Sequence, residues 1–255
     1  MSDSARKLEV AAVEGAERMP EDVLRKIRES RRHPKWTQFD YLHVRYVIAA
    51  MEATLPNIVP SARDVLDVYC GTRPYDDMLP PSARIVGLDV TDFAGVADVV
   101  STEFLPFDDD SFDLVMCFEA FYYVKDPHEA VKEIRRVLRP GGAVVITASL
   151  PWEYDKRILE YRYTGPHLAE LFKDWDDVEV TENGGYAVSW ATLTGRIVRV
   201  AEERAPAPLR LVLRPLLGAA YLSINAVGAC LDWAERRRPR THVLPMNVML
   251  TARRR

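Results

Sequence analysis

The stretch DVLDVYCGTRPYDDML, residues 64–79, joins an apolar run to a turn that contains one glycine. The run DVLDVY is typical of a short buried strand, and Gly71 marks the turn after it. We predict that the chain then enters a helix whose first N–H groups point at a ligand. Nucleotide-binding loops of this kind usually have two or three glycines, but here Tyr69 and Arg73 stand where small residues are expected.

The segments around this loop alternate between strand and helix patterns. Asp126 and Pro127 predict the N-cap and first residue of a helix over 126–142 that a glycine ends. The alternation predicts an α/β fold, with a doubly wound, mostly parallel seven-stranded sheet and right-handed crossovers. The other strands are expected at 83–90, 97–100, 112–118, 142–150, 177–182 and 243–253, and the later helices at 165–175, 185–203 and 208–238.

Three regions follow from this pattern. Residues 1–60 predict an N-terminal helical cap, with helices at 20–32 and 39–55. Residues 61–183 form the predicted ligand-binding core. Residues 184–255 add a helical segment, inserted before the last strand, and complete the same domain.

The composition is that of an ordinary soluble globular protein, with 48% hydrophobic and 28% charged residues. Three cysteines without metal-type spacing, Cys70, Cys117 and Cys230, indicate reduced thiols in a cytosolic compartment. The polar start MSDSARKLEV lacks the apolar region of a secretory signal, so we expect a cytoplasmic protein.

Charge is unevenly distributed along the chain. The net charge is -4, yet residues 206–255 contain nine arginines and two acids. Such a segment suits an acidic partner or an anionic membrane surface, or it is a solvated face with a free terminus. The apolar stretch 216–231 is short for a membrane span. It either packs in the core or gives 208–238 a peripheral contact with the inner membrane face.

Several kinds of site are excluded by missing motifs. The sequence contains no P-loop and no complete G-x-G-x-x-G, which disfavours NAD. It has no H-E-x-x-H, G-x-S-x-G or Cys/His cluster, so it gives no support for a metal or serine-hydrolase site. In a parallel sheet, ligands bind at the carboxyl ends of the strands. That rim is predicted to hold Asp67, Gly71, Asp89, Ser101 and Glu119.

Asp89 ends the second predicted strand, where its carboxylate can accept hydrogen bonds from two ribose hydroxyls or cap the segment that follows. Two further motifs, LPFDDDSFDLV at 105–115 and EIRRVLRPGG at 133–142, occur with the strand-one loop in a fixed order. In these motifs the chain resembles the class I S-adenosylmethionine-dependent methyltransferases of the type 11 group over residues 64–150. CGTRPY and YRYTGPHLAELF are similar to a subgroup associated with glycan biosynthesis.

The resemblance implies a Rossmann-like methyltransferase fold, with S-adenosylmethionine as cofactor and S-adenosylhomocysteine as product. It also implies roles for individual residues. The strand-one loop would wrap the methionine portion of the cofactor, Asp89 would bind its ribose, and Val90 would flank its adenine. The slot that usually holds an adenine-binding aspartate contains Ser101 and Thr102. The cofactor residues expected in this way are Asp67, Tyr69, Gly71, Thr72, Asp89, Val90, Ser101, Thr102 and Phe118.

By the same resemblance, the expected reaction is O-methylation of a sugar, glycan or other small-molecule hydroxyl by in-line displacement, which requires a base. The candidate bases are Glu119, Tyr122 and His167, and Glu153 and Asp155 are further candidates. The family often has a histidine after the fourth strand, but FYYVKDP has none. Residues 151–164 are the expected acceptor lid, helped by residues 39–46. Within that lid Arg162 would hold an acidic acceptor group or pair with Glu160.

Two alternatives remain open. A methyltransferase-like protein that transfers no methyl group would fit a Tyr69 side chain that fills the cofactor pocket. RNA or protein methylation is disfavoured because the body of the chain is acidic and its basic residues lie near the C-terminus. The sequence leaves the oligomeric state open.

Overall fold

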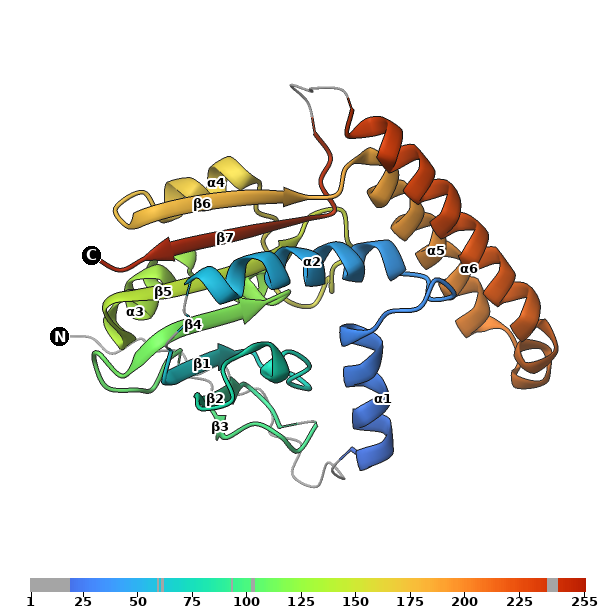
Figure 1. The fold of residues 1–255 in the computed structure, drawn as a ribbon. Coiled ribbons are helices and arrows are strands. Elements are labelled where there is room, and N and C mark those ends of the chain that lie inside the picture. Colours follow the sequence, from blue (N-terminus) through green and yellow to red (C-terminus); the bar gives the residue numbers. More distant parts are fainter. Residues whose placement is uncertain (1–18, 59, 61, 93, 102–103, 238–242) are drawn as a thin grey trace.

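The computed structural model describes residues 19–58, 60, 62–92, 94–101, 104–237 and 243–255. Seven strands form one sheet in the order β3-β2-β1-β4-β5-β7-β6, shown in Figure 1. Only β7 runs antiparallel to its neighbours. The predicted doubly wound, mostly parallel fold is therefore confirmed. The strands are β1 (Asp64–Val68), β2 (Arg84–Asp89), β3 (Val99–Val100), β4 (Phe112–Phe118), β5 (Leu138–Ser149), β6 (Asp176–Asn183) and β7 (Asn247–Arg253).

Helices cover both faces of this sheet. On one face, α2 packs Val47, Met51 and Leu55 against alternate residues of the central strands. On the other face, α3 and α4 pack against the intervening strand residues. This alternation is the period-two pattern of a sheet that is buried on both sides. The helices are α1 (Glu21–Arg32), α2 (Tyr41–Ile58), α3 (Pro127–Val137), α4 (Gly165–Leu171), α5 (Tyr186–Arg204) and α6 (Ala207–Glu235).

The helix predicted after the first strand is absent. The connection from β1 to β2 contains only one 3-10 turn, Asp76–Met78. Two prolines, Pro80 and Pro81, follow this turn and cannot donate helical hydrogen bonds. The apolar surface of β1 on this side, at Val65, is covered instead by α2. The loop therefore does not offer a ligand the N-terminus of a helix.

The α3 helix begins as predicted, because the Asp126 side chain accepts hydrogen bonds from the N–H groups of His128 and Glu129. It ends at Val137, however, and not at the glycines. Leu138 already pairs with Phe112 across the sheet, so the glycines lie inside the bulged start of β5.

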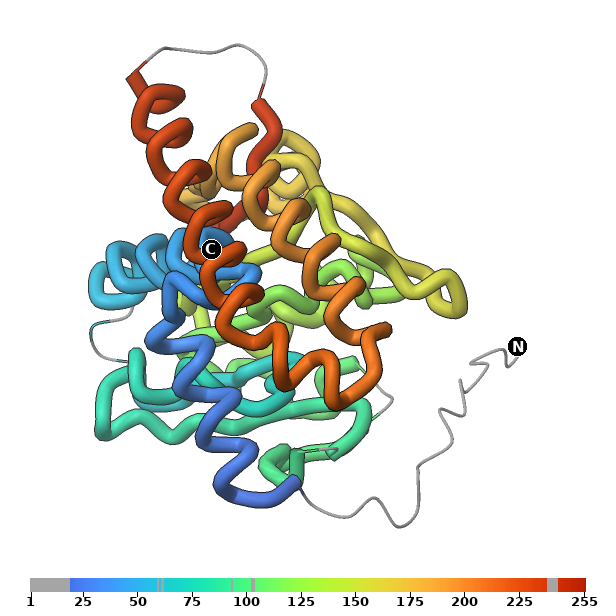
Figure 2. Tube along the Cα trace, turned by 90° about the vertical axis from the view of Figure 1, so that its right-hand side faces the viewer, coloured from blue at the N-terminus to red at the C-terminus, as the bar shows by residue number. Residues whose placement is uncertain are grey.

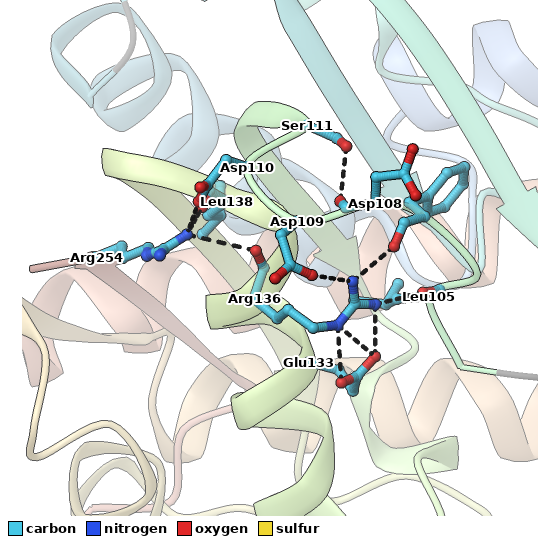
Figure 3. A network of polar contacts seen from close by, with 10 residues as sticks. Leu105, Asp108, Asp109, Asp110, Ser111, Glu133, Arg136, Leu138 and Arg254 are labelled. Atoms are coloured by element: carbon cyan, nitrogen blue, oxygen red, sulfur yellow. Dashed lines mark hydrogen bonds and ion pairs between the residues drawn. The ribbon is translucent and has the colours of Figure 1, made fainter.

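Arg136 ties the two most characteristic sequence motifs together, as Figure 3 shows. Its guanidinium donates to the carbonyls of Leu105 (3.0 Å) and Phe107 (2.7 Å), and it pairs with Asp109 at 2.8 Å. A planar fork with several N–H donors can hold such a turn as a lysine cannot. The 105–115 motif and α3 are thus one structural unit.

The C-terminal region forms a helical hairpin and then the last strand. Figure 2 shows α5 and α6 side by side on the surface. The chain returns through β7, which inserts between β5 and β6. Arg253, Arg254 and Arg255 form ion pairs with Asp177, Asp110 and Asp176. These end arginines are therefore largely balanced by acids within the fold.

Candidate functional site

A cavity of about 250 Å³ lies at the carboxyl ends of β1 and β4, against the first turns of α2. This is the rim where parallel sheets bind their ligands. Its walls combine carboxylates, a histidine and several aromatic rings. The lining residues are Arg31, Asp40, His43, Val44, Val47, Asp67, Tyr69, Cys70, Gly71, Thr72, Pro74, Tyr75, Phe118, Glu119, Tyr122, Ser149 and Trp152.

The strand-one loop adopts a glycine-like backbone without the usual glycines. Tyr69, Gly71 and Arg73 have φ angles of 58°, 54° and 51°. Left-handed backbone is strained for residues with a Cβ, at a cost of about 1–2 kcal/mol each. The loop therefore retains the conformation typical of a ligand-binding turn although two of its positions are not glycine.

Arg73 does not enter the cavity, because its side chain cross-links the loop to the neighbouring strands. It pairs with Asp76 at 2.9 Å and Asp98 at 2.6 Å, and donates to the Ile85 carbonyl at 3.2 Å. Tyr69 does line the cavity, but its ring packs toward Phe104, with centroids 6.4 Å apart. The two unusual residues thus stiffen the loop and leave room beside it.

Asp67 is a buried carboxyl group on the cavity wall. Burial, followed by the nearby Asp76 carboxylate, raises the pKa of Asp67 to about 8. Its carboxyl group forms no hydrogen bond or ion pair with another described residue, and a nearby positive charge would favour its ionised form. Such a group fits a cationic ligand.

The predicted ribose anchor lies beside this cavity and not in its wall. The Asp89 carboxylate accepts hydrogen bonds from the N–H of Gly71 at 2.9 Å and from the N–H of Val90 at 2.7 Å. Val90 is exposed, and the Ser101 N–H donates to the Asp89 carbonyl at 3.0 Å. These three residues form a rim along β2 and β3. Thr102, the other predicted adenine contact, lies outside the described residues.

Glu119 follows β4 directly and is the centre of a polar cluster. Its backbone has a φ of 53°, and its N–H donates to the carbonyl of Thr147 at 3.0 Å. Its carboxylate accepts hydrogen bonds from Ser149 and from Asn247 of the last strand. Burial opposes its ionisation, but contacts with His43 and Ser149 outweigh burial and hold the pKa of Glu119 below its usual value. Glu119 is therefore a fixed carboxylate and a weak base.

Sequence reasoning missed the histidine of this site, which is His43 on α2. Its Nε2 lies 3.3 Å from a Glu119 carboxylate oxygen, and its ring stacks on Trp152 with centroids 5.8 Å apart. Its Nδ1 is buried and has no hydrogen-bond partner among the described residues. A histidine within the apolar pattern of residues 39–55 was the available signal.

The other predicted base residues have different surroundings. Tyr122 lines the cavity, and burial raises the pKa of its hydroxyl well above the ordinary value, so it is a poor base. His167 is exposed on α4 against the Tyr163 ring and does not line the cavity. Glu153 pairs with Arg196, and Asp155 pairs with Arg157.

The predicted acceptor lid reaches the cavity through a single residue. Of residues 151–164, only Trp152 lines it, whereas α2 and the residue before it contribute Asp40, His43, Val44 and Val47. Arg162 pairs with Glu160 at 2.9 Å, the second of its two expected roles. The N-terminal cap thus supplies more of the wall than the lid does.

Comparison with known proteins agrees with this architecture. Residues 66–146 match a family model described as a methyltransferase domain. Demethylmenaquinone methyltransferase of Bacillus subtilis is 32% identical over 137 residues, which are 45% of this chain and 59% of that enzyme. Cycloartenol-C-24-methyltransferase 1 of Oryza sativa subsp. japonica is 27% identical over 176 residues, covering 59% of this chain and 49% of that enzyme. The chain thus spans about half to three fifths of these curated relatives.

Two solved structures share the fold at low sequence identity. The [4+2]-cyclase SpnF superimposes with a TM-score of 0.51 and 17% identity, over 81% of this chain and 80% of that one. A Galdieria sulphuraria protein described as a sarcosine dimethylglycine methyltransferase gives 0.51 and 18%, over 83% and 86%.

The strand order is that of a Rossmann-like methyltransferase fold, and residues 66–146 match a methyltransferase domain, so both findings support the class of S-adenosylmethionine-dependent methyltransferases that the sequence motifs indicated. S-adenosylmethionine is the cofactor of that class. The predicted glycan-associated subgroup is not addressed by these comparisons and stays a prediction.

Proposed function

We propose that the protein transfers a methyl group from S-adenosylmethionine to a hydroxyl of a small molecule bound in the cavity. The observation that carries the proposal is that one cavity holds both the buried Asp67 carboxyl and the His43–Glu119 pair. The cofactor supplies a methyl group that a positively charged sulfonium activates. The residues then need only to align the acceptor, exclude water and remove a proton.

The cofactor-binding residues are proposed in two groups. Asp67, Tyr69, Gly71, Thr72 and Phe118 line the cavity and would hold the methionine portion, with Asp67 opposite its positive charge. The Asp89, Val90 and Ser101 rim would hold the nucleoside. For this, the Asp89 carboxylate would accept ribose hydroxyls in addition to, or in place of, its backbone donors.

His43 is the proposed base. The ionised Glu119 attracts the Nε2–H of His43 and leaves Nδ1 as an acceptor. Nδ1 is buried and has no partner among the described residues, so it would take the proton of an acceptor hydroxyl that displaces the atoms covering it. Trp152 stacks on the ring and restricts the access of water to it. Glu119 would then orient His43 and stabilise the imidazolium that forms.

The acceptor is proposed to carry its hydroxyl on a ring with an apolar face. Tyr75, Phe118, Tyr122 and Trp152 provide aromatic walls. The curated relatives are named for a quinone and a sterol substrate. A sugar ring, as the sequence led us to expect, also presents an apolar face to aromatic side chains. The acceptor class is therefore tested as a panel of phenols, sterols and sugars.

The first test is titration of S-adenosylmethionine and S-adenosylhomocysteine by calorimetry, with Asp89→Ala alongside. We expect binding that Asp89→Ala weakens strongly.

Labelled methyl transfer to the acceptor panel then compares the wild type with His43→Gln. We expect the variant to bind the cofactor normally and to lose about 10²–10⁴-fold in kcat. Absence of cofactor binding would refute the proposal.

A second candidate function is a reaction without methyl transfer, which two observations favour. The Tyr69 ring lines the cavity, and both Asp89 carboxylate oxygens already accept backbone N–H groups. The same titration decides between the functions. If Tyr69→Ala binds the cofactor and the wild type does not, the tyrosine closes the cofactor site.

A further inference from the structure

The outer helix of the hairpin, α6, buries polar residues and exposes many apolar side chains, which is the opposite of an ordinary surface helix. Its buried positions, one turn apart, are Tyr221, Asn225, Gly228 and Asp232. Eight large apolar side chains of α6 are exposed: Leu209, Leu211, Val212, Leu216, Leu222, Val227, Leu231 and Trp233. A surface helix of a globular protein normally turns its polar residues outward. The apolar side of α6 therefore requires an explanation other than core packing.

The inward polar residues fix α6 to the body of the protein. Tyr221 donates to a Glu202 carboxylate oxygen at 2.8 Å. Asn225 donates to two backbone carbonyls of the loop before α2, each at 2.8 Å. Asp232 accepts a hydrogen bond from Tyr46 on α2. These contacts determine which side of α6 faces outward.

The neighbouring helix extends the same apolar surface. On α5, Tyr186, Trp190, Leu193 and Ile197 follow each other at helical spacing, and all are exposed. Figure 2 shows both helices on the side of the molecule that faces the viewer. We call the exposed apolar side chains of α5 and α6 the hairpin face. An apolar area of this length on a helix pair is typical of a surface that something else covers.

The exposed charged residues at the two ends of α6 are arginines. Arg210 and Arg214 lie near its start, and Arg236 and Arg237 lie just beyond its end, where Arg236 also pairs with the buried Asp232 at 3.1 Å. The two acids of α6 turn inward. Asp232 is buried, and the Glu235 carboxylate accepts N–H groups from Tyr186 and Ala187 at the start of α5. The hairpin face is thus apolar along its length and basic at both ends of α6.

This charge arrangement discriminates between the possible partners. If two copies paired along α6 in either direction, basic ends would lie against basic ends, and like charges oppose association. An anionic lipid surface instead attracts both ends while the apolar side chains enter the headgroup region. Among the described residues, α6 is the one helix that is long enough and apolar enough to cross a membrane. Only 17% of its most apolar 18-residue stretch is buried. Its inward contacts with the body favour a helix that lies along a surface.

We propose that the hairpin face docks on an anionic lipid bilayer, with α6 parallel to the membrane plane. Binding then needs both the apolar side chains and the arginines at the two ends. It does not depend on the proposed methyl transfer, because no residue of the hairpin face lines the cavity.

The test is co-sedimentation of the full chain with vesicles of phosphatidylcholine, with and without phosphatidylglycerol. We expect binding to the vesicles that contain phosphatidylglycerol, weakened by salt. The double variant Leu216→Glu/Val227→Glu places two charges on the hairpin face, where these side chains are 68% and 48% exposed. We expect its binding to fall at least about tenfold. Arg210→Gln/Arg214→Gln should weaken binding to the anionic vesicles only.

A matched control is Lys132→Gln/Lys173→Gln, which changes the net charge by the same amount on α3 and just after α4. Both lysines are exposed and have only surface ion pairs. This variant should bind as the wild type does, and thermal unfolding verifies that every variant folds. The proposal is overturned if the wild type ignores anionic vesicles, or if the control loses as much binding as the hairpin variant. It is also overturned if light scattering shows a dimer that Leu216→Glu/Val227→Glu dissociates and vesicles do not bind.

Discussion

At the scale of single residues, the strand-one loop shows how one conformation can be built from unexpected side chains. Tyr69 and Arg73 take the left-handed backbone that glycine adopts freely. The strain is offset by what their side chains contact: Tyr69 packs toward Phe104, and Arg73 bonds to Asp76 and Asp98. A loop with glycines at these positions would have the same turn but no cross-link to β2 and β3.

Asp67 gives a prediction on the pH dependence of cofactor binding. Because burial raises its pKa to about 8, Asp67 is mainly protonated at neutral pH in the ligand-free protein. A cationic cofactor prefers the ionised carboxylate, so affinity should rise with pH by up to about tenfold per unit below pH 8. Calorimetry between pH 6 and 9 measures this rise. Asp67→Asn should show a much flatter profile, and an equally steep one would contradict the assignment.

The same group makes a prediction on stability. The unfolded chain ionises Asp67 near its ordinary pKa of 3.8, whereas the folded chain does so only near pH 8. The folded state therefore holds an extra proton between these values, and its stability falls as pH rises through that window. Asp67→Asn removes this dependence. It should stabilise the ligand-free protein more at pH 8 than at pH 5, as measured by chemical denaturation.

At the scale of helices, two glycines of the hairpin, Gly195 and Gly218, have opposite surroundings. Gly195 of α5 lies against the loop before α2, where an added Cβ would be 2.4 Å from the Phe39 carbonyl oxygen. A Cβ added at Gly218 of α6 would meet no other atom within 4 Å. Only the first glycine is required by close packing, and this packing brings α5 next to the start of α2.

This difference predicts opposite effects of the same substitution. Gly195→Ala forces backbone apart and should lower the free energy of unfolding by about 1–3 kcal/mol. Gly218→Ala removes backbone freedom from the unfolded chain without a clash, and should raise it by about 0.5–1 kcal/mol. Urea denaturation of both variants provides the measurement. Equal signs for the two would show that the close approach at Phe39 is not retained in solution.

At the scale of the whole molecule, distant segments complete one site. The last strand brings Asn247 to Glu119, which follows β4, while α2 brings His43 to the same carboxylate. Asn247 is held in turn by Asn183 of β6 at 3.0 Å. The site therefore combines α2, which packs on one face of the sheet, with β7, which pairs within it.

The attachment of the hairpin to this body gives the last prediction. Asn225 is buried and donates to the carbonyls of Trp36 and Gln38. Asn225→Leu keeps a similar volume but removes both hydrogen bonds, which should cost about 1–3 kcal/mol of unfolding free energy. Ser223→Ala, on the exposed side of α6, should change it by less than about 0.5 kcal/mol. Hydrogen exchange should show faster opening of α6 in Asn225→Leu, and unchanged exchange would rule out this attachment.

The sequence by itself predicted the positions of the strands along the chain, the class of protein and the rim residues Asp67, Gly71 and Glu119. It could do so because these features are local: apolar runs mark strands, the Asp126 cap marks α3, and motifs of fixed spacing mark the family. It failed where a local pattern had to compete with packing. The helix expected after β1 is replaced by α2 on that face, and α3 ends early because Leu138 joins the sheet.

Only the tertiary structure decided which side chains meet. His43 lies 76 positions before Glu119 in the chain, and no spacing rule relates an N-terminal helix to the end of the fourth strand. The outward direction of the apolar residues of α6 is likewise set by three polar contacts with distant segments. Periodicity showed that α6 has an apolar side, but the direction in which that side faces depends on the partners of its polar residues.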